Sequence, residues 1–326
     1  MSRCIRSTKW KTRRSRKTRD TFSQGLAVKF EYLPAKKSFL DSLREDAHTP
    51  DSARAVIIPF GLEASVSYGR GTAAGPKAIL VASQQLELFD EEFWREPYKD
   101  YGIACLKPPK IKSGIVAALK QLEDIVAAVV ENNKFPFVLG GEHSVTCAAI
   151  RPLAQKYKDL VILQLDAHAD LRDGYQGERY SHASAMRRVL DDANITLVQV
   201  GIRGLCQEEA DFYDANRHRI HMHLGIDQAR WDIEKIVAPL KGRPVYITFD
   251  IDGLDAAIMP ATGTPVPGGI SYLQALAILR RACDVSNVVG ADLVEFAPLK
   301  GLHAYDFTAA ALAYKILNYA LAKRVK

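Results

Sequence analysis

Side chains that bind metal ions recur at every second position in one stretch of the chain. The apolar run at residues 161–165 is followed by Asp166, His168 and Asp170. A β-strand places residues i, i+2 and i+4 on one face, so an extended path beyond the run would bring these three side chains together. Buried carboxylates need partners or a metal, and carboxylate oxygen and imidazole nitrogen suit hard to borderline divalent ions. The stretch therefore predicts a metal site.

Two further apolar runs end in the same kinds of side chain. Residues 245–249 precede Asp250 and Asp252, and residues 137–139 precede a Gly-Gly-Glu sequence and His143. In an open parallel α/β sheet, sites form at the carboxyl ends of the strands. The predicted metal ligands are therefore His143, Asp166, His168, Asp170, Asp250 and Asp252.

This ligand set is too large for one tetrahedral zinc, and it contains no cysteine. Four carboxylates suit two divalent cations that share bridging oxygens. Two such ions can hold a bridging hydroxide and stabilise the charge that develops on attack at a planar carbon. The chemistry predicted is hydrolysis with a nucleophile derived from water. Ser144 follows His143, but no Gly-x-Ser-x-Gly sequence surrounds it, so it is not expected to be a nucleophile.

Strand-like and helix-like patterns alternate along the chain, which is typical of βαβ units and a parallel sheet. Strands are expected near 55–60, 137–140, 161–170, 196–201, 220–224, 245–252 and 288–296, with one more short strand within 90–112. Helices are expected over 76–89, 114–132, 145–157, 182–190, 230–240, 271–283 and 306–323. Ser113, Ser271 and Asp306 are the expected N-caps of three of them. The glycine-rich loop at 68–76 lacks the following Lys-Ser/Thr of a phosphate site, so a structural role is expected.

The composition is that of a globular enzyme-sized protein. Hydrophobic residues make up 48% of the 326 residues and charged residues 25%, which is ordinary for a folded α/β protein. The five cysteines are widely spaced, without a Cys-x-x-Cys pair, which indicates a reduced, cytoplasmic environment. No apolar run is long enough to suggest a membrane span, so no membrane partner is expected.

The net charge of +6 comes from one end of the chain. Residues 3–19 contain nine Lys and Arg and no acid; removing these nine from the 44 basic residues leaves 35, against 38 acidic ones. Binding of nucleic acid by the body of the protein is therefore not indicated. We expect residues 1–25 to be a disordered basic extension and residues 26–326 to be a single α/β catalytic domain. An organelle-targeting peptide is the alternative interpretation of the extension.

Four motifs in a fixed order resemble those of the ureohydrolase family of arginases and agmatinases. They are Gly-Gly-Glu-His-Ser at 140–144, Asp-Ala-His-Ala-Asp at 166–170, Ser-His-Ala-Ser at 181–184, and Asp-Ile-Asp-Gly-Leu-Asp at 250–255 followed by Thr-Gly-Thr-Pro at 262–265. The resemblance covers roughly residues 50–322. It implies the three-layer α/β/α fold of that family, two Mn²⁺ ions per subunit, and self-association as a trimer or hexamer.

The resemblance also implies roles for single residues. His143 and Asp170 would bind one ion, His168 and Asp252 the other, and Asp166 and Asp250 would bridge both. Asp170 would also accept a hydrogen bond from the bridging hydroxide. His182 would carry a proton to the leaving amine, which suits an imidazole near its unperturbed pKa. Glu295 would pair with a guanidinium, which matches a carboxylate in bidentate geometry. Asp255 resembles an aspartate that supports its loop.

The loop between Asp170 and His182 lacks the Thr/Ser/Asn-rich run that holds the α-amino acid end of the substrate in arginases. Asp173 and Glu178 could meet a cationic amine there. The sequence resembles the agmatinase branch, so the predicted reaction is agmatine to putrescine and urea, a step of polyamine biosynthesis. N1-aminopropylagmatine is a near rival, and Arg172 and Arg179 keep guanidinobutyrate open.

Two other classes of protein compete with a dimanganese ureohydrolase. A zinc amide hydrolase of the deacetylase type shares the fold but needs one metal, and the second set of ligands argues against it. A non-catalytic family member would usually have lost ligands, whereas all six remain here. A separate cluster at His218, His221 and His223 has a plausible ligand spacing, but no carboxylate alternates with it.

Overall fold

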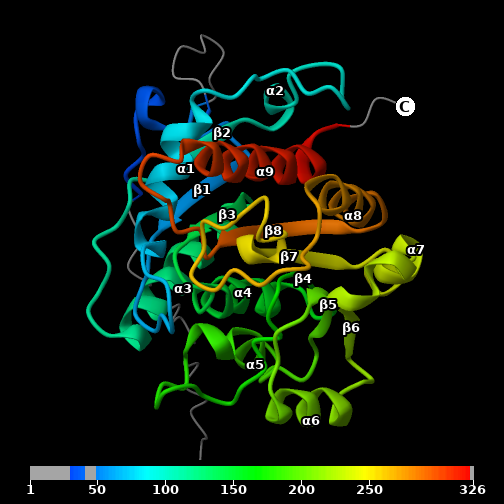
Figure 1. Cartoon of the computed structure of the whole chain (residues 1–326). Coiled ribbons are helices and arrows are strands. Elements are labelled where there is room, and N and C mark those ends of the chain that lie inside the picture. The colour runs from blue at the N-terminus through cyan, green and yellow to red at the C-terminus, as the bar shows by residue number, and fades with distance from the viewer. Residues whose placement is uncertain (1–29, 41–48, 324–326) are drawn as a thin grey trace, which may run out of the picture.

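A single parallel sheet organises the computed structural model, which describes residues 30–40 and 49–323 (Figure 1). The basic extension expected over residues 1–25 lies outside these ranges. Eight strands pair in the order β2-β1-β3-β8-β7-β4-β5-β6, and every pairing is parallel. The strands are β1 Ala55–Phe60, β2 Ile103–Cys105, β3 Phe135–Gly140, β4 Val161–Leu165, β5 Thr196–Ile202, β6 Ile220–Leu224, β7 Pro244–Asp250 and β8 Asn287–Val294. The predicted α/β class with a mainly parallel sheet is confirmed.

Helices cover both faces of this sheet, as expected for parallel strands joined by crossovers. In Figure 1, α1, α8 and α9 lie on one side of the sheet, and α3, α4 and α5 lie on the other. The helices in the described ranges are α1 Gly75–Ser83, α2 Tyr98–Tyr101, α3 Ile115–Glu131, α4 Val145–Lys156, α5 Ala185–Val189, α6 Gln207–Ala215, α7 Ile233–Val237, α8 Tyr272–Val285 and α9 His303–Leu321. The result is three layers, helix, sheet and helix.

The alternation of side chains along the strands divides the core into two parts. In β1, Ala55 and Ile57 pack into the core beneath α1, α8 and α9, whereas Val56, Ile58 and Phe60 pack into the core beneath α3 and α4. All six residues of β1 are buried. A strand covered on both faces is apolar at every position, which explains why these segments appear as continuous apolar runs in the sequence.

Several helix starts differ from the expectation. The Ser271 hydroxyl does accept from the Gln274 N–H and caps α8. Ser113 caps nothing, because Gly114 takes a φ of 85° and becomes the residue before α3. Asp306 lies in the first turn of α9, which begins at His303. The expected helix over 182–190 consists of a 3₁₀ turn, His182–Ser184, followed by the short α5.

Helix α6 was not predicted. It is mostly polar, so it has no apolar stripe from which to recognise it. Its first turn is held instead by Glu209, whose carboxylate accepts from the backbone N–H of Cys206 at 2.8 Å. Across the described ranges, no helix has the length and hydrophobicity needed to cross a membrane.

The four strands at the middle of the sheet position the predicted metal ligands and Glu295. Strands β3, β8, β7 and β4 are consecutive neighbours, and each is followed or ended by a site residue at its carboxyl end. The extended path that would bring Asp166, His168 and Asp170 together by alternation does not continue past Leu165, where β4 ends. The segment beyond it is a loop in which Asp170 takes a left-handed φ of 54°. The carboxylates therefore converge through loop geometry, not through strand alternation.

Gly253 allows the ends of β4 and β7 to approach each other closely. A Cβ at this position would lie 2.8 Å from the Asp166 nitrogen and 3.0 Å from the Leu165 carbonyl carbon. Backbone atoms of a central strand cannot move away as a flexible side chain can. A side chain here would push apart the two loops that carry Asp166 and Asp252.

We therefore expect Gly253→Ala to lower the free energy of unfolding by about 1–3 kcal/mol and to reduce bound metal, because overpacking distorts the ligand loops. Calorimetry and metal analysis of the purified protein measure the two effects. Gly242→Ala is the control, because a Cβ there meets nothing within 4 Å. The alanine would be strained only by the φ of 71° at this position. Equal metal contents in the two variants would contradict the expectation.

Candidate metal centre and active-site cavity

Asp166 stands at the centre of the site, directly after β4. One carboxylate oxygen accepts the backbone N–H of His168 at 2.6 Å, and the other accepts the side-chain amide of Gln164 at 2.6 Å. Gln164 is itself fixed by Gln199, whose amide donates to its oxygen at 2.7 Å. These bonds hold the carboxylate in one orientation in a fully buried position.

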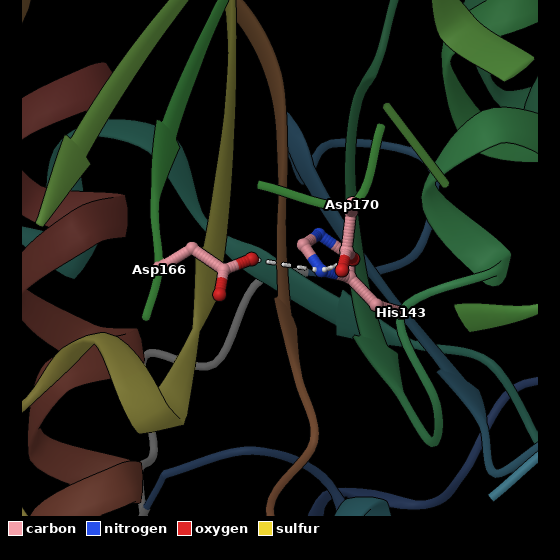
Figure 2. Close-up of side chains that lie close together, drawn as sticks. All are labelled: His143, Asp166 and Asp170. Atoms are coloured by element: carbon pink, nitrogen blue, oxygen red, sulfur yellow. Dashed lines mark ion pairs between the residues drawn. The ribbon is translucent and has the colours of Figure 1, made fainter. Parts of the chain in front are cut away.

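His143 and two carboxylates form the first group of possible ligands. The Nδ1 atom of His143 lies 3.1 Å from Asp166, 2.9 Å from Asp170 and 3.3 Å from an oxygen of Asp250. Figure 2 shows the imidazole of His143 with the Asp166 and Asp170 carboxylates directed toward it. His143 comes from the loop after β3, whereas Asp166 and Asp170 both come from the loop after β4.

His168 forms the second group together with Asp252 and, again, Asp166. Its Nδ1 atom lies 3.0 Å from Asp252 and 3.8 Å from Asp166. Asp166 is shared by both groups, which is the arrangement of a bridging carboxylate. Asp250 lies beside the first group through one oxygen, while its other oxygen accepts the Asp252 N–H at 2.9 Å. The structure thus brings all six predicted ligands together.

This cluster concentrates negative charge where water is scarce. Burial, with the neighbouring Asp252, raises the pKa of Asp166 to about 7 and the pKa of Asp250 well above its ordinary value. Burial is the largest single influence on Asp252 and acts in the same direction, but the charge and hydrogen bond of His168, with hydrogen bonds from the Ala167 N–H and Asp250, together outweigh it and lower the pKa of Asp252 to about 2. Carboxylates that resist ionisation in this way lack sufficient positive charge around them.

The donor atoms fit divalent metal ions. Nδ1 of His143 is buried without a hydrogen-bond partner, although three carboxylate oxygens surround it. A cation among these atoms would satisfy both the ring nitrogen and the carboxylates. The other ring nitrogen, Nε2, lies 2.9 Å from the Thr248 hydroxyl, a contact that orients metal-binding histidines. Four carboxylates and two imidazoles form an oxygen-rich set that suits Mn²⁺ and similar ions.

Arg203 and Asp255 hold the loops around the ligands. The Arg203 guanidinium donates to the Asp252 carbonyl at 2.6 Å and to the Val266 carbonyl at 2.9 Å, which ties the ligand loop to the proline-rich loop 260–269. The Asp255 carboxylate accepts the N–H groups of Ala257, Gly268 and Gly269. The expected supporting role of Asp255 thus matches its contacts.

A cavity of about 270 Å³ opens over the cluster. Its walls include the predicted residues His182 and Glu295, together with Tyr175 and the loop residues Gly263 and Thr264. One oxygen of Glu295 accepts the His143 N–H at 2.6 Å, and the residue takes a left-handed φ of 61°. Desolvation is the main cause that raises the pKa of Glu295 well above its ordinary value. A cationic group beside it would stabilise the charged form.

The acidic pair proposed for the substrate tail does not line this cavity. The Asp173 carboxylate pairs with the Arg188 guanidinium at 2.6 Å, and Glu178 accepts the N–H of Tyr180 at 3.0 Å. Both belong to the loop between β4 and α5, but their carboxylates are held by neighbours in the protein. Arg172 of this loop and Glu209 of α6 do line the cavity.

Sequence reasoning missed three residues that the structure brings into the site. Ser65 lies 3.2 Å from Nδ1 of His182, and Glu142 accepts the Ser65 hydroxyl at 2.8 Å. Tyr175 packs edge-on against His182 with ring centroids 6.1 Å apart. Glu142 lies inside the Gly-Gly-Glu-His motif, and its place next to His143 could have indicated a role in the site. Ser65 and Tyr175 belong to loops without a recognisable pattern.

The rival histidine cluster receives no support from its surroundings. His221 and His223 lie on β6 at the edge of the sheet, away from the ligand loops. Among the described residues, the groups of side chains close enough to hold a metal are those around Asp166. Burial lowers the pKa of both His221 and His223.

Comparison with known proteins agrees with this geometry. The model of the arginase family matches residues 53–321. The chain belongs to the arginase family. It is therefore a metal-dependent ureohydrolase by descent, and the predicted resemblance is confirmed.

Individual relatives are similar over most of the chain. N(1)-aminopropylagmatine ureohydrolase of Synechocystis is 35% identical over 298 residues, which covers 89% of this chain and 95% of the relative. Agmatinase of Bacillus cereus is 36% identical over 255 residues, covering 76% and 85% of the two chains. The structure of agmatine ureohydrolase of Thermoplasma volcanium superposes with a TM-score of 0.75 at 31% identity, covering 85% of this chain and 93% of that one.

Because both groups of ligands share Asp166, Asp166→Ala should abolish binding of both metal ions. Elemental analysis of the purified protein after dialysis against Mn²⁺ measures the stoichiometry. Asp173→Ala is a matched control, because the same change at a carboxylate outside the cavity should leave the metal content unaltered. Retention of two ions by Asp166→Ala would show that its carboxylate is not a bridge.

Proposed function

We propose that the protein hydrolyses the guanidino group of agmatine, or of its N1-aminopropyl derivative, to urea and the corresponding amine, with two Mn²⁺ ions bound by the six ligands. The observation that carries the proposal is the position of Glu295. It is a carboxylate held on the cavity wall by the His143 N–H, beside a cluster of six metal-type ligands. A guanidinium is the cation that best matches a carboxylate in planar geometry.

Substrate binding follows from this placement. The guanidinium would pair with Glu295, whose charge is otherwise disfavoured by desolvation. The planar carbon would then face the ligands of the metal ions. The two divalent ions would supply an activated water for attack on this carbon and would offset developing charge. Asp166 belongs to both groups of ligands. Its hydrogen bonds with Gln164 and the His168 N–H hold the two groups in a fixed position relative to each other.

His182 is suited to complete the reaction. It lies on the wall of the same cavity and comes from the 3₁₀ turn that precedes α5, not from the ligand loops. When the bond between the guanidino carbon and the substituted nitrogen breaks, that nitrogen needs a proton to leave as an amine. A neutral imidazole can take up a proton to become an imidazolium. It can then deliver that proton to the leaving nitrogen and become neutral again.

The choice between the two amines rests on different observations. The composition of the loop between β4 and α5 favours the agmatinase branch over arginases. The relatives named N(1)-aminopropylagmatine ureohydrolase match a longer part of this chain, 298 residues in the Synechocystis protein against 255 in the Bacillus cereus agmatinase. This difference supports the aminopropyl derivative of agmatine as a second candidate substrate.

The substrate class can be tested by urea release from Mn²⁺-loaded protein. Agmatine, N1-aminopropylagmatine, arginine and guanidinobutyrate should be compared at equal concentrations. We expect kcat/KM to be highest for one of the first two, by at least about tenfold, which corresponds to about 1.4 kcal/mol of transition-state stabilisation. A preference for arginine or guanidinobutyrate, or no urea from any of the four with two ions bound, would contradict the proposal.

We expect His182→Ala to lower kcat by a factor on the order of one hundred or more while the protein keeps both metal ions, because the leaving amine loses its proton donor. Steady-state urea release and metal analysis measure the two quantities. His221→Ala, at a histidine on the edge strand β6, is the control and should leave kcat unchanged. An unaltered kcat in His182→Ala would rule out this proton transfer.

A further inference from the structure

Two residues outside the metal cluster hold the imidazole of His182. We infer that Ser65 and Glu142 are positioning residues that place the proton of neutral His182 on Nδ1, so that Nε2 is the nitrogen that exchanges protons in the cavity. The inference rests on the proposed function of His182 and deepens it. It assigns a task to a carboxylate and a hydroxyl that bind neither metal nor substrate.

The three residues come from separate segments of the chain. Ser65 lies in the loop after β1, Glu142 lies between β3 and α4, and His182 begins the 3₁₀ turn His182–Ser184. The Ser65 hydroxyl donates to the Glu142 carboxylate at 2.8 Å and lies 3.2 Å from Nδ1 of His182. Glu142 is fully buried, whereas Ser65 and His182 are partly exposed. The chain of contacts therefore leads from a buried carboxylate to the ring at the cavity wall.

Glu142 determines the direction of these hydrogen bonds. Its carboxylate is surrounded by four donors, namely the hydroxyls of Ser65 and Ser144 and the backbone N–H groups of Ala64 and Ser65. An ionised carboxylate is an acceptor only. The single hydrogen of the Ser65 hydroxyl is therefore committed to Glu142.

The Ser65 oxygen can then only accept from His182. It already accepts the backbone N–H of His182 at 3.0 Å, and its remaining lone pair faces Nδ1 at 3.2 Å. A stable contact at that distance requires a hydrogen on Nδ1. In the neutral ring the other nitrogen, Nε2, then carries the lone pair, and it is free to serve the cavity that His182 lines.

This tautomer is the productive one. Nε2 would first take a proton from a water molecule in the cavity, leaving the hydroxide that attacks the guanidino carbon, and the ring becomes an imidazolium with a hydrogen on each nitrogen. It then releases the Nε2 proton to the departing amine nitrogen and is neutral again, with Nδ1–H unchanged throughout. The opposite tautomer would present a hydrogen to the cavity before any proton had been taken up. Tyr175, edge-on to the ring at 6.1 Å between centroids, limits reorientation.

Ser181 offers a competing arrangement. Its hydroxyl oxygen lies 3.4 Å from the same Nδ1 atom and accepts the Ala183 N–H at 3.3 Å. If Ser181 donated its hydrogen to Nδ1, the proton of the ring would move to Nε2. The Ser65 contact is shorter and is oriented by a buried carboxylate, so it should prevail. A hydrogen bond to Ser65 therefore predicts a hydrogen on Nδ1 of His182, whereas a hydrogen bond from Ser181 predicts that Nδ1 carries none.

The side chain of Ser65 can be removed without removing the support that Glu142 gives to the loop. Ser65→Ala keeps both backbone N–H groups that donate to Glu142, and it deletes only the hydroxyl between Glu142 and the ring. Ser65→Thr restores a hydroxyl. Ser181→Ala removes the competing hydroxyl and is the matched control. A purely structural role for Glu142 would leave the ring tautomer unaffected in all three variants.

The first measurement is the protonation of each ring nitrogen of His182, by nitrogen-15 NMR of histidine-labelled protein loaded with Zn²⁺, which does not broaden signals as Mn²⁺ does. His182→Ala assigns the signals by their absence. Wild type, Ser65→Thr and Ser181→Ala should show a hydrogen on Nδ1 of the neutral ring, and Ser65→Ala should show a shift toward Nε2–H. A neutral wild-type ring with its hydrogen on Nε2 would overturn the inference, and this result needs no variant.

The second measurement is turnover of the Mn²⁺-loaded protein with its best substrate. Ser65→Ala should lower kcat between about 10- and 100-fold, with KM and metal content unchanged, which is the range for loss of an outer hydrogen-bond partner. Ser65→Thr and Ser181→Ala should stay within about twofold of wild type. If Ser65→Ala moved the hydrogen from Nδ1 to Nε2 of His182 but left kcat unchanged, the inference that this tautomer is needed for turnover would be overturned. If no guanidino substrate is hydrolysed, the proposed function fails, but the NMR result still decides the tautomer.

Discussion

The concentration of four aspartate carboxylates at the end of one sheet is the constraint on which the rest of the site depends. In a buried position these groups lose their hydration and repel one another, and burial first, then the charge of Asp252, raises the pKa values of Asp166 and Asp250. The fold tolerates the repulsion because hydrogen bonds fix the carboxylates of Asp166, Asp250 and Asp252 and because cations can occupy the space among them. A protein that buries this charge stabilises its folded state through the ions it binds.

Rigid surroundings are needed to hold such a cluster. Arg203 crosses from the ligand loop to the loop 260–269 through carbonyl contacts, and Asp255 closes that loop with three N–H groups. Asp170 and Glu295 both adopt left-handed backbone conformations, which non-glycine residues adopt rarely. Positions of this kind persist where neighbouring contacts determine them, and they gather at functional sites. Here both residues line the cavity.

Much of the architecture could be predicted from the sequence, since strands covered on both faces are apolar throughout and the ligands stand at their ends. The six candidate ligands could be selected from the sequence because two histidines and four aspartates are unusual in a core, and the structure brings their side chains together. The path of Asp170 could not be predicted from alternation, because the chain leaves the strand at Leu165. Helix α6 escaped notice, since a capping carboxylate and not an apolar stripe holds its start. The acids of the β4–α5 loop were misjudged for a similar reason: their charge was visible, but the pairing of Asp173 with Arg188 was not.

The order of strands bears on how the protein is made. His143 follows β3 and Asp166 follows β4, yet in the sheet these two strands are separated by β8 and β7, which come last in the chain. Nearly the whole polypeptide must therefore be translated before β7 and β8 can take their places between β3 and β4. Until residue 295 has emerged, the early ligands have no common scaffold. Binding of metal at this site would therefore require a chain that has been translated through β8 and in which β7 and β8 have paired between β3 and β4.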